Sequence, residues 1–194
     1  MKPITKQWLE SNNACSEGVR MFSAQKETDP KKIIKALMKL KRFDFANWLI
    51  VRQFNKKQNV QYAIYAARQV LSIYEKKNPK DKRPRLAIEA AENYVKNPCK
   101  KTKDAAYAAT AAAADAAYAA DAAYAAAAAY AAADAADAAY AAAAAAAYAA
   151  DAAYAAYAAA DDAYAADAAA AYAAAKQQME LKILEYGIKL LRGK

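Results

Sequence analysis

The stretch from Asp104 to Ala175 restricts what this chain can fold into more than any other part of the sequence. Of its 72 residues, 52 are alanine, ten are tyrosine, nine are aspartate and one is threonine. Alanine is the best helix former and loses no side-chain entropy on folding. Because the tract contains no glycine or proline to interrupt a helix, we predict that it is helical.

The tract is not expected to form one uninterrupted helix. Such a helix would be about 108 Å long at 1.5 Å per residue, and it would need one continuous stripe of larger side chains to pack against the rest of the chain. At 100° per residue, Tyr124, Tyr130 and Tyr148 fall well outside the stripe that contains Tyr107. An Asp-x-x-Tyr unit instead recurs at Asp104, Asp115, Asp121, Asp137, Asp151 and Asp161. Aspartate is a common N-cap, so the sequence predicts an alanine-rich slab of short stacked helices.

Charge divides the sequence into three segments, which we expect to form one compact unit. Residues 1–103 hold 24 Lys or Arg against 9 Asp or Glu, residues 104–175 hold nine Asp and no basic residue, and residues 176–194 hold five basic and two acidic residues. A basic half beside an acidic tract favours either internal pairing or a basic face open to an anionic partner. Solvated lysine side chains are the simpler alternative.

The basic half has the apolar spacing of amphipathic helices. Asp29 and Pro30 are start signals for a helix through KKIIKALMKLKRF, and Asp44 is a plausible N-cap for the next, DFANWLIVRQF. That segment is so rich in large apolar residues that most of them should be buried. Asn78 and Pro79 should end a third helix.

Two further helices complete the predicted fold. Pro84 suits the first turn of a helix that runs to about Tyr94. The tail QQMELKILEYGIKLLRGK has the pattern of an amphipathic helix that docks back onto the N-terminal half. The sequence therefore predicts an all-α, compact multi-helix domain.

The residue types present argue against catalysis. The chain has no histidine, the side chain that most often acts as a general acid or base and binds metals. Cys15 consequently lacks the usual activating partner, and we expect it to be a buried packing residue. No acidic pair in the tract resembles a calcium loop. We expect no enzymatic activity, no catalytic residue, no metal and no cofactor.

Targeting and nucleic-acid signals are also missing from the sequence. The N-terminus lacks the apolar run of a signal peptide, and aspartates interrupt the alanine tract too often for a membrane span. Two distant cysteines do not suggest a disulfide framework. These features predict a cytoplasmic protein. No zinc or recognition-helix pattern supports sequence-specific DNA binding, and the acidic tract would repel DNA.

A group of basic residues near Pro84 is the sharpest candidate binding site. Arg83 and Arg85 flank a predicted helix N-terminus, where backbone N–H groups and arginine forks can hold a phosphate. The secondary phosphate-binding candidates are Lys82, Arg68 and Lys77, and Tyr65 or Tyr74 could stack on a base. The alternative is structural, because the same arginines could pair with Asp81 or Glu89.

Several segments resemble one protein family. They are WLESNNACSEGVRMF, FDFANWLIVRQF, YAIYAARQVLSIYEKKNPKDKRPRLAIEAAENYV, the alanine tract and LEYGIKLL. Together they are similar to the alanine-rich putative immunity proteins of bacteria and phages. The resemblance implies a small soluble protein that neutralises something by binding it, and it supplies no catalytic residues.

Two functions from different classes follow from these expectations. The first is sequestration of an anionic nucleotide used as an immune signal, which would place the protein in the bacterial host cytoplasm if a phage encodes it. The second is direct inhibition of a protein toxin or defence enzyme, in which charge would set partner choice. Ice binding is disfavoured, because Thr110 is the only threonine in the tract. The repeated alanine faces would also suit a homo-oligomer.

Overall fold

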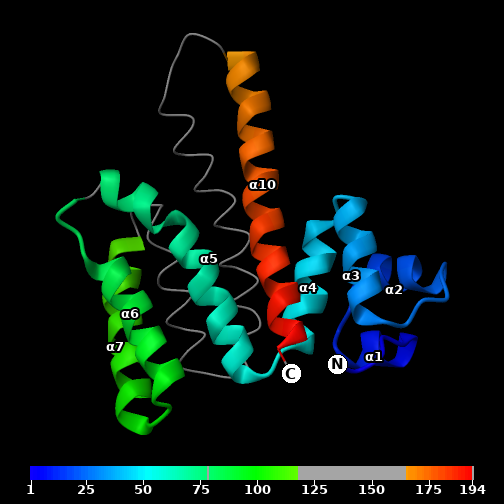
Figure 1. The fold of residues 1–194 in the computed structure, drawn as a ribbon, viewed down its shortest axis with the longest axis horizontal. Coiled ribbons are helices and arrows are strands. Elements are labelled where there is room, and N and C mark those ends of the chain that lie inside the picture. Colours follow the sequence, from blue (N-terminus) through cyan, green and yellow to red (C-terminus); the bar gives the residue numbers. More distant parts are fainter. Residues whose placement is uncertain (78, 118–164, 194) are drawn as a thin grey trace.

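The chain is all-α in every part that the structure describes. The computed structural model describes residues 1–77, 79–117 and 165–193, apart from some helical side chains, those of Tyr74 and Lys77 among them. These ranges contain eight helices and no strand (Figure 1). The predicted fold class is confirmed, whereas most of the predicted alanine slab lies outside the described residues.

Four short helices form the N-terminal part of the fold: α1 (Lys6–Ser11), α2 (Ser16–Ser23), α3 (Pro30–Lys39) and α4 (Phe43–Gln53). The start of α3 is the predicted one, because the Asp29 carboxylate accepts a hydrogen bond from the Lys31 backbone N–H at 2.8 Å and Pro30 opens the helix. The chain before α1 is held against the loop before α3, because the Ile4 N–H donates a hydrogen bond to the Thr28 carbonyl at 2.9 Å.

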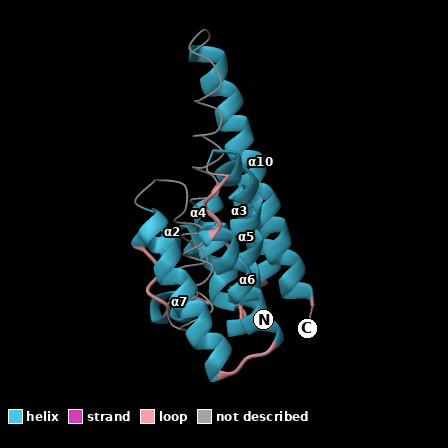
Figure 2. Cartoon of the chain, turned by 90° about the vertical axis from the view of Figure 1, so that its left-hand side faces the viewer, coloured by secondary structure: helices cyan, strands magenta, loops and turns pink. Residues whose placement is uncertain are grey.

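Four longer helices follow: α5 (Lys56–Lys77), α6 (Arg83–Lys96), α7 (Lys100–Ala117) and α10 (Ala165–Arg192). Helix α10 packs against both α4 and α5, so the C-terminal helix lies between the N-terminal helices and the α5–α7 group (Figure 1). The tail therefore packs on helices of the N-terminal half. The first part of α10 projects beyond the other labelled helices (Figure 2), and the α10 residues described as buried lie between Ile183 and Leu191.

The junction between α4 and α5 is a capping box that also holds the end of α10. The Gln58 N–H donates to the Asn55 side-chain oxygen at 2.9 Å, and the Asn55 N–H donates to the Gln58 side-chain oxygen at 3.0 Å. The Gln58 side-chain amide then donates to the Leu190 carbonyl at 2.7 Å. Gln58 therefore helps to cap the start of α5. It also donates to the Leu190 carbonyl, which lies in the last turn of α10 and has no partner within its own helix.

The centre of the core is the contact of α10 with α4 and α5. Tyr62 is 0% exposed, and its hydroxyl donates to the Asn47 side-chain oxygen at 2.8 Å. Gly187 faces this ring: a Cβ atom there would lie 2.9 Å from Ile50 Cγ2 and 3.0 Å from Tyr62 Cε2. A glycine is therefore needed at position 187 for α10 to approach this closely.

Two sequence expectations are wrong, and two of the six Asp-x-x-Tyr aspartates do not begin a helix. Asp44 is not an N-cap, because α4 begins one residue earlier, at Phe43. Cys15 is exposed rather than buried, and its sulfur acts as the N-cap of α2 by accepting from the Gly18 N–H at 3.4 Å. Asp104 and Asp115 both lie inside α7 and start no helix. The other four Asp-x-x-Tyr units lie outside the described residues.

Helix boundaries do not follow the charge segments. Helix α7 begins at Lys100, in the basic half, and continues into the alanine tract, while α10 begins at Ala165, within the tract, and continues into the tail. Alanine favours helix formation next to basic and acidic residues alike, so a change in charge along the sequence does not end a helix. None of the helices in the described ranges could cross a membrane.

Candidate functional site

Arg83 and Arg85, the main predicted phosphate ligands, are each paired with a carboxylate. The Arg83 side chain donates two hydrogen bonds to Asp81, at 2.9 and 2.7 Å, and its backbone N–H donates a third at 3.0 Å. Arg85 donates two bonds to Glu75 on α5, at 2.7 and 2.5 Å. The Arg85 contact joins α5 to α6 and holds the pKa of Glu75 below its usual value. Both forks that would bind a phosphate already bind carboxylates.

The secondary residues do not complete one cluster. Arg68 pairs with Glu92 at 2.6 Å, and Glu92 lies seven residues beyond Arg85, about 10 Å further along α6. Lys82 is exposed at the N-cap position of α6. Lys77 belongs to α5, but its side chain is among those not described.

Tyr65, one of the two predicted stacking residues, already has an aromatic partner within the fold. Its ring stacks on Tyr186 of α10, with centroids 4.0 Å apart and planes 11° apart. One face of the ring is therefore covered, and the contact belongs to the packing of α10 on α5. Tyr74 lies on α5, and its side chain is outside the described set.

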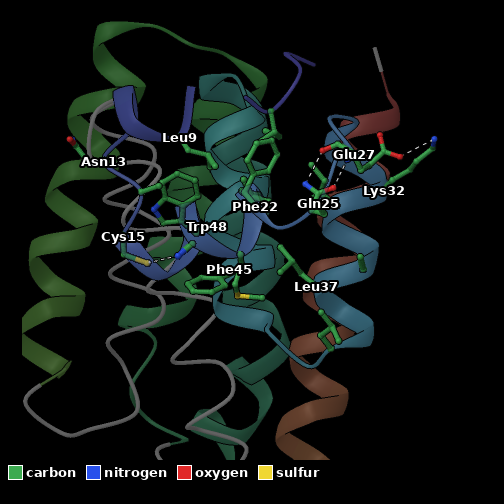
Figure 3. A pocket seen from close by; sticks show the side chains of 18 residues that line it. Leu9, Asn13, Cys15, Phe22, Gln25, Glu27, Lys32, Leu37, Phe45 and Trp48 are labelled. Carbon is green, nitrogen blue, oxygen red and sulfur yellow. Dashed lines mark hydrogen bonds and ion pairs between the residues drawn. The ribbon is translucent and has the colours of Figure 1, made fainter. Parts of the chain in front are cut away.

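A second concave site lies among α1, α2, α3 and α4, where no binding residue was predicted (Figure 3). It is a cavity of about 480 Å³, within the usual range for ligand pockets. Most of its wall is apolar, and the lining residues are Ile4, Leu9, Asn13, Ala14, Cys15, Gly18, Met21, Phe22, Gln25, Glu27, Lys32, Ile33, Ala36, Leu37, Leu40, Phe45, Trp48 and Leu49. Leu40 is 64% exposed and gives this wall an open apolar edge. We call this site the α1–α4 pocket.

Cations outside the pocket brace two of its aromatic side chains. The Arg52 guanidinium lies over the Trp48 ring at 4.0 Å, and Trp8 meets the same ring edge-on at 6.0 Å. The Arg42 guanidinium lies over the Phe45 ring at 3.9 Å. Such contacts hold a ring in one orientation, so the aromatic wall is held in place by the fold.

Arg42 is itself fixed by two carboxylates. It bonds Glu17 of α2 at 2.7 Å and Asp44 of α4 at 3.1 Å, and these contacts raise its pKa further above its usual value. Asp44 lies within the first turn of α4, one residue after the helix begins, where its carboxylate pairs with Arg42. Arg42 thereby ties α2 to the start of α4 beside the pocket.

The loop from Gln25 to Asp29 forms a polar rim on the pocket. The Glu27 carboxylate accepts the Thr28 and Asp29 N–H groups, each at 2.9 Å, and pairs with Lys32 at 3.1 Å (Figure 3). The backbone hydrogen bond from Asp29, followed by the bond from Lys32, lowers the pKa of Glu27. The rim is therefore a charged pair beside an apolar interior.

The pocket offers mostly apolar contacts, with a few polar groups at its mouth. Its lining has no histidine, and the thiol of Cys15 is engaged as the cap of α2. Across the described ranges, no three His, Cys, Asp or Glu side chains gather closely enough to hold a metal ion. Apolar walls with a few polar groups at the mouth suit an apolar ligand or an apolar side chain of another protein.

Sequence reasoning missed the pocket for a specific reason. The dense apolar segment DFANWLIVRQF was expected to be mostly buried, and Leu49 and Val51 are, but Phe45 and Trp48 are only half-buried. Helical spacing shows that a residue faces inward without showing whether its neighbours fill the space beside it. The aromatic density of this segment was the only available signal.

The chain matches the model of a known protein family. The model of the Imm-5 like putative immunity protein family matches residues 49–181. No curated protein and no protein of solved structure matches the chain. The matched region contains the arginine–carboxylate pairs of α5 and α6, whereas Leu49 is the only lining residue of the α1–α4 pocket inside it.

Proposed function

Because the chain belongs to the Imm-5 like putative immunity protein family, we propose that it neutralises a protein toxin or defence enzyme by binding it directly, without catalysis. The observation that carries this proposal is the α1–α4 pocket, a cavity of about 480 Å³ with an apolar, aromatic wall. Protein interfaces draw most of their affinity from a few anchors that enter such pockets. The target would insert an aromatic or large aliphatic side chain there.

The arrangement of the pocket suits this role. Trp48 and Phe45 are held in place by Arg52 and Arg42, so little side-chain entropy is lost when a partner binds. The Glu27–Lys32 pair at the rim is exposed and can contribute to partner choice more than to affinity. A preformed apolar interior with a charged rim is the usual composition of a protein interface.

Nucleotide sequestration is the second candidate function, and one observation favours it. Arg83, Arg85 and Lys82 are exposed around the first turn of α6, within the region that the family model matches. A phosphate there would have to displace Asp81 and Glu75 from bidentate contacts, and the released carboxylates would repel it. For this reason we place direct protein binding first, reversing the order suggested by the sequence.

A thermal-shift experiment distinguishes the two functions. With a panel of cyclic and linear nucleotides, we expect no stabilisation of the wild-type protein, because the arginine forks are occupied. A rise of several degrees in the unfolding temperature with one nucleotide would establish sequestration instead. The rise would have to be lost in the variant Arg83→Gln with Arg85→Gln and kept in the variant Lys96→Gln with Lys100→Gln. The control pair removes the same charge from exposed lysines outside the cluster.

Photocrosslinking from the pocket edge tests direct binding. A photoreactive phenylalanine analogue replaces either Leu40 or Leu86 in protein expressed in its bacterial host. Both leucines are exposed, at 64% and 55%, but only Leu40 lines the pocket. We expect one protein to be crosslinked from position 40 and not from position 86. Equal crosslinking from both positions, or none from position 40 in cells where the protein is protective, contradicts the proposal.

A further inference from the structure

A second groove runs between α3 and α10, on helices far apart in the sequence. Its volume is about 430 Å³. Four cations line it, Lys35 and Lys39 from α3 with Lys189 and Arg192 from α10, and its apolar floor is formed by Met38, Leu181 and Ile188. No local sequence pattern indicates this combination, because it depends on α3 and α10 both packing against α4. We call it the α3–α10 groove.

The positive charge of this groove is largely uncompensated. Among the described residues that line the groove, Glu185 is the only acidic one, against four cations. None of the ion pairs found among the described residues includes one of these five side chains. This differs from Arg83 and Arg85, which are engaged by carboxylates.

Helix dipoles account for only part of this charge. Lys39 lies in the last turn of α3, and Lys189 and Arg192 lie in the last turn of α10, where cations are favourable. Lys35 lies one turn earlier in α3 and gains little from the dipole. Its position adds charge to the groove without a comparable benefit to the fold.

We infer that the α3–α10 groove binds an acidic amphipathic helix of a partner protein. A groove between two helices with an apolar floor can receive large side chains spaced three or four residues apart on such a helix. Carboxylates beside those anchors would pair with the four cations at the rim. None of the described residues that line the groove has an aromatic ring on which a base could stack, so this lining does not suit a nucleotide.

This inference rests on the proposed function, because it supplies a second contact for a protein target. Helix α3 is a wall of both sites: Ile33 and Ala36 line the α1–α4 pocket, while Lys35 and Met38 line the α3–α10 groove. A partner that spans α3 could occupy both. The two sites can nevertheless be tested separately, since each has a methionine of its own, Met21 in the pocket and Met38 in the groove.

The test uses the full chain and a designed peptide of about 14 residues, about four helical turns, with leucine anchors and glutamates beside them. Binding is measured by fluorescence anisotropy, and its place by the methyl NMR signals of labelled methionines. We expect the Met38 signal to shift while the Met21 signal stays. The variant Lys35→Glu with Lys189→Glu should bind at least about tenfold more weakly. The variant Lys57→Glu with Lys101→Glu, which has the same charge change at exposed sites on α5 and α7, should bind as the wild type does.

Four results would overturn the inference. The first is that a peptide with lysine in place of glutamate binds as tightly as the acidic peptide, and the second is that both charge-reversal variants lose the same affinity. The third is a Met38 signal that does not move when the peptide binds. The fourth is tighter binding to phosphatidylglycerol vesicles or inorganic tripolyphosphate than to the acidic peptide. The peptide experiment does not involve the natural target. A negative peptide result therefore does not decide the outcome of crosslinking from Leu40. Conversely, a failed crosslink does not affect the peptide result.

Discussion

Replacing Ala36 by tryptophan is expected to weaken binding of the crosslinked protein at least about 30-fold, equivalent to about 2 kcal/mol. Ala36 is exposed on α3 and lines the α1–α4 pocket, so an indole at this position would occupy the space intended for the partner's anchor. The substitution fills a preformed cavity rather than the core, and the free energy of unfolding should change little. Affinity is measured by calorimetry, and stability by urea unfolding.

The matched control is Ala105→Trp, which places the same side chain on an exposed position of α7 away from the pocket. We expect Ala105→Trp to bind as the wild type does. If both variants bind equally well, the pocket is not the contact site. If Ala36→Trp unfolds at a much lower urea concentration, the cavity is part of the structural core and our view of it as a binding site fails.

Replacing Gly187 by valine is expected to destabilise the fold by about 3 kcal/mol or more, the upper part of the range for overpacked cores. Its Cβ alone would lie 2.9 Å from Ile50 Cγ2 and 3.0 Å from Tyr62 Cε2, and both neighbours are 0% exposed. Valine adds two more methyl groups, so α10 would have to move away from α4 and α5. The urea midpoint followed by circular dichroism measures the loss.

Gly193→Val is the control, because a Cβ there would meet only the Leu190 carbonyl oxygen, at 3.8 Å. It should unfold near the wild-type midpoint. Adding Ile50→Ala should recover part of the stability lost in Gly187→Val, since the nearest clashing atoms are removed. Equal midpoints for the two glycine variants would mean that α10 does not approach α4 and α5 this closely.

Local sequence signals predicted much of the helical fold. Asp29 with Pro30 starts α3, Pro84 lies at the beginning of α6, and the amphipathic tail forms part of the helix α10. Each of these depends on a few neighbouring residues or on one helical face. A residue type suited to a cap was not sufficient in every case. Asp44 lies inside the first turn of α4, and its carboxylate pairs with Arg42.

The two concave sites were harder to predict, because each combines residues from separate helices. The α1–α4 pocket takes its lining from residues 4 to 49, and the α3–α10 groove joins residues about 150 positions apart in the chain. No local pattern shows such neighbours. The arginines of α6 were recognised from sequence, but which carboxylate engages each of them depends on the packing of α5 on α6 and on the turn before α6.

Helix α3 therefore has two roles that its own sequence does not separate. Its apolar residues Ile33, Ala36 and Leu37 line the pocket, and its lysines 35 and 39 line the groove on another side. Amphipathic helices usually bury one face and expose the other to water. Here both faces border concave surfaces, which is why both proposed contacts involve α3.

Binding of a protein target in the α1–α4 pocket should change the methyl NMR signal of Met21. Met21 lines the pocket, whereas Met179 on α10 lines neither site. With stoichiometric amounts of the crosslinked protein, we predict that the Met21 signal shifts in the wild type, that the Met179 signal does not, and that Ala36→Trp abolishes the change. A bound partner that leaves the Met21 signal unmoved would contradict the account.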